Sequence, residues 1–371
     1  MLRRILCALA ALLLWTAPGC AEGFRESDYA LEGPFIVDVW PLDAENVAAS
    51  CWEHETGDAD EPLYLTWWRQ GTIYRQIRYT WTENNRDLVP IDGDTCRVLT
   101  LEADGETGYR PAPTRATLYD WTAAGMENSR VLAEGVISRR INRNAIALLR
   151  RAEGKTWLCL YDGGGAPEAE LEMAEGIDNV ISAARDDGGL WAVTVAARPI
   201  NNNFHPMVIR DGQILWEGDT GGLVHAAQMD GAGGYFVVER LSGSQYAPLT
   251  ITRYDDHGGR LRRWELSGKN VVLSAQSRMD PATGNLVILG MATANSRNFR
   301  CVYRLEADEK GRILSLDTRA CPGGEEIRGN LYLSPDCREA RVLLRRLDGT
   351  PASWVPFEAL PAGENPDIRL K

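Results

Sequence analysis

Long apolar runs, histidines and blocks of basic residues are all scarce in this sequence of 371 residues. After residue 20, no stretch approaches the eighteen or more consecutive apolar residues of a membrane-spanning helix. The formal net charge is -12, and an acidic surface repels nucleic acid and anionic lipid headgroups. We therefore expect no nucleic-acid partner and no direct binding of the folded domain to lipid.

Catalytic motifs are equally scarce. Only four histidines occur, and the sequence contains no HExxH, GxSxG, P-loop or GxGxxG motif. The eight cysteines include no CxxC pair, which is the commonest spacing in metal and redox sites. Four cysteines lie inside apolar strand patterns, and we expect them to be buried small hydrophobic residues: Cys51, Cys96, Cys159 and Cys301. These absences favour a protein that is not an enzyme.

The first twenty residues have the composition of a secretory signal. Arg3 and Arg4 precede an apolar run over residues 5–15, which is too short to span a bilayer. Gly19-Cys20 resembles the end of a bacterial lipobox, where Cys20 would carry the lipid. Ordinary cleavage after Ala21 is the alternative. Lipidation would leave residues 21–28 as a short tether and hold the protein on the extracytoplasmic face of a bacterial membrane.

One short pattern recurs along the whole chain: a strand, a tight turn built on Asp or Asn, and a second, more apolar strand. Asp and Asn suit such turns because their side chains bond nearby backbone and tolerate positive φ. The interval between successive turns is 44 to 56 residues, which is typical of a repeat architecture. The turn residues are Asp43, Asp92, Asn142, Asp186, Asp230, Asp280 and Asp336.

Each repeat has room for four strands, and none carries an amphipathic helix. Four antiparallel strands in about 45 residues are typical of a β-propeller blade. We therefore predict an all-β, seven-bladed β-propeller over residues 29–360, with six or eight blades as alternatives. The last unit lacks an outer strand, and Tyr29 to Glu32 are expected to supply it and close the ring. Residues 361–371 are predicted to form a C-terminal tail after the propeller.

The hairpins that join a turn aspartate to a tryptophan resemble those of bacterial PQQ-like and other quinoprotein-type propellers. The clearest examples are Asp211 to Trp216 and Asp256 to Trp264. The resemblance covers the repeat pattern of residues 34–359 and no complete family motif. It implies a propeller fold, and it implies nothing specific about function. WD40 signatures and complete sialidase-type Asp-boxes are absent.

The loops between the second and third strands of each unit, which we call the B–C rim, are predicted to hold a binding site. The first loop gathers carboxylates around His54, which suits either a Ca²⁺ ion or a solvated acidic loop. Amides and aromatic side chains in later loops suit a peptide or a glycan. The candidate ligand-binding residues are His54, Asp58, Asp60, Tyr109, Arg110, Asn202, Phe204, His205, Tyr246 and Arg297.

The innermost strands of a propeller line a central channel, and four of their polar residues are candidates for binding an anion or carboxylate. These are Arg139, Arg185, His225 and Gln276. The alternative is that such residues are polar because water fills the channel.

Together these features predict a non-catalytic, extracytoplasmic binding or scaffold propeller. Its partner would be an envelope protein, a peptide or a glycan, and we expect a monomer without a cofactor. The alternative is an extracytoplasmic carbohydrate-active enzyme that uses carboxylates at the channel mouth.

Overall fold

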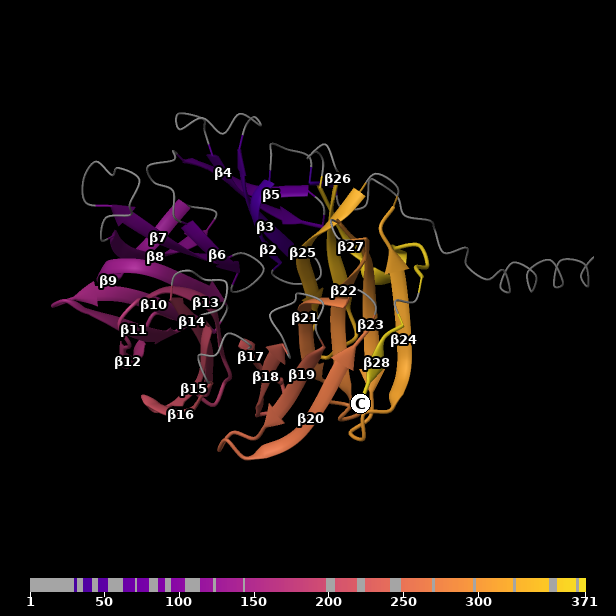
Figure 1. Ribbon diagram of the computed structural model, residues 1–371. Coiled ribbons are helices and arrows are strands. Elements are labelled where there is room, and N and C mark those ends of the chain that lie inside the picture. The colour runs from indigo at the N-terminus through magenta and orange to yellow at the C-terminus, as the bar shows by residue number, and fades with distance from the viewer. Residues whose placement is uncertain are drawn as a thin grey trace, which may run out of the picture.

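A computed structural model of the protein is an all-β propeller with antiparallel blades (Figure 1). The sheets follow one another around a common centre in chain order, with the first strand of each unit on the inside. The structure describes residues 30–31, 36–41, 46–52, 63–70, 72–79, 86–90, 95–103, 114–122, 125–142, 144–197, 204–218, 224–240, 248–268, 271–295, 298–322, 325–346, 352–364 and 367–371.

The first half of the chain forms three sheets. The first contains β2 (Ile36–Pro41), β3 (Asn46–Trp52), β4 (Leu63–Arg69) and β5 (Thr72–Tyr79). The second contains β6 (Arg86–Pro90), β7 (Cys96–Ala103), β8 (Thr114–Thr122), β9 (Gly125–Asn142), β10 (Ala145–Ala152), β11 (Lys155–Asp162) and β12 (Pro167–Met173). The third contains β13 (Ile177–Arg185), β14 (Trp191–Ala197), β15 (Phe204–Arg210) and β16 (Gln213–Glu217).

The second half also forms three sheets. The fourth contains β17 (Val224–Met229), β18 (Tyr235–Arg240), β19 (Leu249–Tyr254), β20 (Arg260–Ser267) and the C-terminal β28 (Arg369–Leu370). The fifth contains β21 (Val271–Met279), β22 (Leu286–Asn295), β23 (Asn298–Ala307) and β24 (Ile313–Ala320). The sixth contains β25 (Glu325–Leu333), β26 (Ala340–Arg346), β27 (Ala352–Pro356) and β1 (Ala30–Leu31), and a 3₁₀ helix follows at Phe357–Ala359.

The described strands form six sheets, so the prediction of seven separate blades is wrong. The physical reason is β9, which runs unbroken for 18 residues and belongs to two repeat units. Its first part pairs with β8, where Met126 lies opposite Trp121, and its last part pairs with β10, where Ile141 lies opposite Ile146. The second and third repeats are therefore fused into one seven-stranded sheet.

The turns behave largely as their sequences predict. The Asp186 carboxylate accepts a hydrogen bond from the backbone N–H of Leu190 at 2.8 Å, and Asp230 accepts one from Gly234 at 2.9 Å. Such bonds close a hairpin locally, without help from the rest of the fold. In the last unit Asp336 accepts a hydrogen bond from the Arg338 N–H at 3.2 Å, and the Ser334 hydroxyl accepts one from the Glu339 N–H at 2.9 Å, so two side chains close this turn. Asp43 and Asp92 lie outside the described residues.

The core lies between neighbouring sheets. Trp191 packs with apolar residues of β10 and β11, and Trp264 packs with residues of β22 and β23. Both tryptophans are 2% exposed, as large side chains are when they fill the space between two packed sheets. Cys96 and Cys159 are buried as predicted, whereas Cys301 is only partly buried.

Both ends of the described chain pair with outer strands. Ala30 lies opposite Ser353 of β27, and Leu370 lies opposite Leu266 of β20. Before it reaches β28, the C-terminal segment also crosses β24, where the Ala320 N–H donates to Pro361 O at 2.8 Å. Figure 1 shows β28 beside the fourth and fifth sheets. No helix of the described part of the chain is both long and apolar enough to cross a membrane.

Candidate functional site

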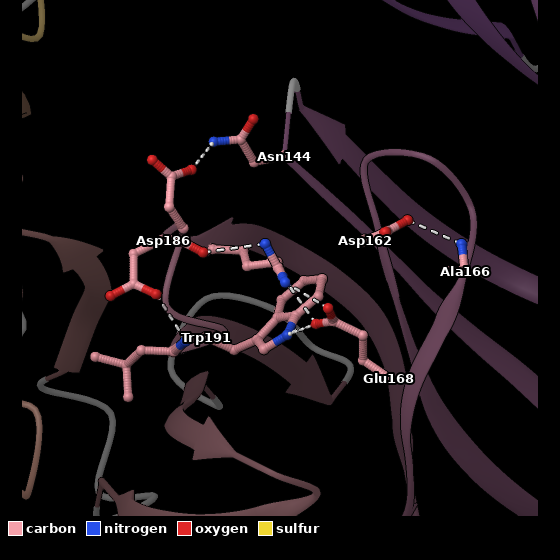
Figure 2. Close-up of polar contacts among 9 residues, drawn as sticks. Asn144, Asp162, Ala166, Glu168, Asp186 and Trp191 are labelled. Carbon is pink, nitrogen blue, oxygen red and sulfur yellow. Dashed lines mark hydrogen bonds and ion pairs between the residues drawn. The ribbon is translucent and has the colours of Figure 1, made fainter.

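A polar cluster joins β12 to the next sheet (Figure 2). The Glu168 carboxylate accepts hydrogen bonds from Trp191 Nε1 at 2.7 Å and from Arg185 Nε at 2.8 Å and Nη2 at 2.5 Å. Leu160 of β11 lies opposite Ala169, but the next residue lies opposite Pro167, so Glu168 is the extra residue of a β-bulge. A bulge can redirect a side chain in this way.

A pocket of about 440 Å³ lies beside this cluster, between the first part of β9 and the strands β10 to β12. Its volume falls in the range of sites that bind small molecules. Apolar and polar residues both line it, from four strands that the fused sheet holds together. The lining residues are Leu132, Ala133, Arg150, Cys159, Tyr161, Pro167, Glu168, Ala169 and Glu170.

An ion pair dominates the polar side of the pocket. Arg150 Nε donates to Glu170 Oε1 at 2.9 Å, and Arg150 Nη2 donates to the same oxygen. The Cys159 thiol lies 3.6 Å from that oxygen, and the Tyr161 hydroxyl donates to Leu132 O at 2.9 Å. The side chains of Arg150 and Glu170 are 30% and 46% exposed, so both reach solvent.

The Cys159 thiol and the Tyr161 hydroxyl in the pocket hold their protons more tightly than usual. Burial raises the pKa of the Cys159 thiol to about 11, and the nearby Glu170 charge adds to the effect. Burial likewise raises the pKa of Tyr161 to about 12. Both groups are therefore protonated near neutral pH, whereas a cysteine nucleophile reacts as the thiolate. The pocket is suited to binding through hydrogen bonds and charge.

Two of the predicted channel residues bond between neighbouring sheets. Arg185 is engaged by Glu168, as described above. The Gln276 side chain donates to Leu331 O at 2.8 Å and accepts from the Leu333 N–H at 2.7 Å, both in β25. Arg139 lies in β9 opposite Leu148, and the His225 side chain lies outside the described part of the chain. Ligand binding by these four residues stays a prediction.

Only two predicted residues of the B–C rim fall within the described ranges. Phe204 and His205 begin β15, opposite Ala196 and Val195 of β14, and both are half-buried. The other rim candidates lie outside these ranges: His54, Asp58, Asp60, Tyr109, Arg110, Asn202, Tyr246 and Arg297. The rim as a binding site therefore stays a prediction.

The carboxylates with shifted pKa values belong to turns. Hydrogen bonds from Ala282 and Thr283 lower the pKa of Asp280, and bonds from the backbone of Arg312 and Lys310 lower that of Asp308. These hydrogen bonds hold the two carboxylates within their own turns. Among the described residues, no group of three or more His, Cys, Asp or Glu side chains could hold a metal ion. The predicted Ca²⁺ loop around His54 lies outside them.

Sequence reasoning missed the Arg150–Glu170 pocket. The alternation of Glu168, Glu170 and Glu172 along a short strand was the available signal. Their partners lie on other strands, so they could be assigned only with the strand registers and the bulge in hand.

No protein-family model matches the sequence, and no curated protein matches it. Among solved structures, an acylaminoacyl peptidase in complex with Z-Gly-Gly-Phe-chloromethyl ketone is similar, with a TM-score of 0.53 and 12% identity over 93% of this chain and 52% of that one. The Pyrococcus horikoshii acylaminoacyl peptidase gives a TM-score of 0.50 and 11% identity over 89% of this chain and 51% of that one.

The WD40 domain of Toxoplasma gondii coronin gives a TM-score of 0.49 and 14% identity, and the match covers 92% of this chain and 91% of that one. The chain spans about half the length of either peptidase. At identities this low a likeness concerns the fold alone. The fold itself, a β-propeller, is shown by the strand order of the structure.

Proposed function

We propose that the protein is a non-catalytic binding or scaffold propeller that recognises an envelope protein, a peptide or a glycan through its B–C rim. The observation that carries this proposal is the strand order. Neighbouring strands within a unit pair antiparallel, and the first strand of each unit lies on the inside (Figure 1), so we expect the connections between second and third strands to share one rim. Loops that converge on one rim of a rigid scaffold are a common place for binding residues.

The proposal also covers location and ancestry. We infer that the chain is exported, lipidated at Cys20 and held on the outer face of a bacterial membrane, on the grounds of its first twenty residues. The hairpins that contain Trp216 and Trp264 support a relation to quinoprotein-type propellers. The pairing of β1 with β27 supports closure of the ring by the N-terminal strand. Mass spectrometry of the mature N-terminus tests the lipid: an unmodified Cys20, or a chain that begins at Glu22, would refute it.

The rim is tested with the exported domain, three rim variants and one control variant. Asn202→Ala, Phe204→Ala and Tyr246→Ala alter the B–C rim. His257→Ala is the control, because its side chain is 82% exposed in the β19–β20 turn at the opposite end of the strands. We expect partners from a native envelope extract to be retained by wild type and the control and lost from the rim variants. Equal retention by all variants would refute the rim as the binding surface.

A further inference from the structure

We propose that the pocket between β9 and β12 binds a short zwitterion, namely a free amino acid or dipeptide with an apolar side chain. This site is separate from the B–C rim and does not depend on it. The fused sheet creates the pocket, because the unbroken β9 carries Leu132 and Ala133 past the outer strands of the third repeat unit.

One nitrogen of Arg150 and one oxygen of Glu170 lie outside the ion pair of the pocket. Arg150 contacts Glu170 through Nε and Nη2, and Glu170 contacts Arg150 through Oε1 alone. Nη1 of Arg150 and Oε2 of Glu170 take no part in the pair. A ligand carboxylate can accept from Nη1 while a ligand ammonium donates to Oε2, and such charge-assisted hydrogen bonds are among the strong ones.

Charge balance selects against ligands of one sign. Glu168 also lines the pocket, but its carboxylate accepts hydrogen bonds from Arg185 and Trp191 of the next sheet. The remaining charges are one guanidinium and one carboxylate. A simple anion is therefore repelled by Glu170 and a simple cation by Arg150, whereas a zwitterion satisfies both.

The apolar residues that line the pocket determine the uncharged part of the ligand. Leu132, Ala133, Pro167 and Ala169 face a volume of about 440 Å³. An aliphatic side chain in this space gains from the removal of apolar surface from water. The chemistry that fits the whole pocket is therefore an ammonium and a carboxylate at one side and a hydrocarbon group at the other.

Calorimetric titration of the wild-type protein provides the first test, and it needs no variant. The probes are leucine, the dipeptide Ala-Leu, N-acetyl-Ala-Leu, Ala-Leu-amide and glucose. We expect leucine or Ala-Leu to bind, and the comparison of these two identifies the length. Blocking either end of the dipeptide should weaken binding at least about tenfold, since each block removes one charge-assisted bond. No binding of either zwitterion, equal binding of the blocked peptides, or preferred binding of glucose would overturn the proposal.

Variants then locate the site. Arg150→Gln and Glu170→Gln should each weaken binding of the better zwitterion about tenfold or more. The control is Lys155→Gln, which breaks a neighbouring cross-strand pair with Glu172 at 2.7 Å outside the pocket lining. Binding of the better zwitterion that survives both pocket variants would overturn the assignment.

Discussion

The C-terminal segment should stabilise the propeller, and Leu370→Ala tests this. Leu370 and Ile368 are 9% and 6% exposed and pack into the core cluster shared by the fourth and fifth sheets. Burial is achieved although β28 has only two residues, because the backbone of Lys371 exchanges two hydrogen bonds of 3.0 Å with Glu265. The segment thus covers the outer edge of β20 as an added strand, which also protects that edge from pairing with other chains.

The magnitude follows from the buried side chain. Truncation of a buried leucine to alanine costs about 2–5 kcal/mol. The lower end applies here, about 2 kcal/mol, since Leu370 keeps some exposure and lies at a sheet edge. The loss of stability cannot exceed the free energy with which the C-terminal segment binds to the propeller. A larger loss would simply detach the segment and leave the ring folded.

Urea unfolding measures the loss of stability, and hydrogen exchange measures the loosening of the C-terminal segment. We expect a lower urea midpoint with an unchanged m-value, and faster exchange of the Glu265 amide, which donates to Lys371 O. The control is Leu314→Ala on β24, whose side chain is 46% exposed and should matter by less than about 0.5 kcal/mol. If Leu370→Ala were as harmless as this control, the packing argument would be refuted.

Three further predictions concern the scaffold. Deletion of residues 24–33 removes β1 from β27 and should lower the urea midpoint; an unchanged midpoint would mean that β1 is dispensable. Gly135→Ala should lower the free energy of unfolding by at least about 1 kcal/mol, since φ is +73° and the new Cβ would lie 2.5 Å from Arg151 O. The control is Gly154→Ala, which has a similar φ but open space around the new Cβ, and it should lower the free energy of unfolding by less. The pKa of Asp280 is lowered, by backbone and then side-chain hydrogen bonds, so Asp280→Asn should destabilise the protein at pH 7. The difference should begin to shrink as the pH falls through about 4, where the carboxyl of the unfolded chain takes up a proton, and should vanish only below the lowered pKa of the folded protein; a pH-independent difference would contradict this cause.

The sequence determined the repeating turns and hence the propeller. A turn such as that at Asp186 depends on a hydrogen bond between residues four apart in the chain, so it can be predicted from a short stretch of sequence. The alternation of apolar strands with these turns was sufficient for the fold class and for the pairing of residues near 30 with the last sheet. The roles of the B–C rim and of Cys20 stay predictions.

Only the tertiary structure decided the number of sheets and the Arg150–Glu170 pocket. Both depend on contacts between strands far apart in the chain. β9 continues unbroken from one unit to the next, and Glu168, the extra residue of the bulge, accepts hydrogen bonds from Arg185 through its carboxylate. Composition and spacing contain neither the continuity of a strand nor its register, because these are settled by the packing of whole sheets against each other.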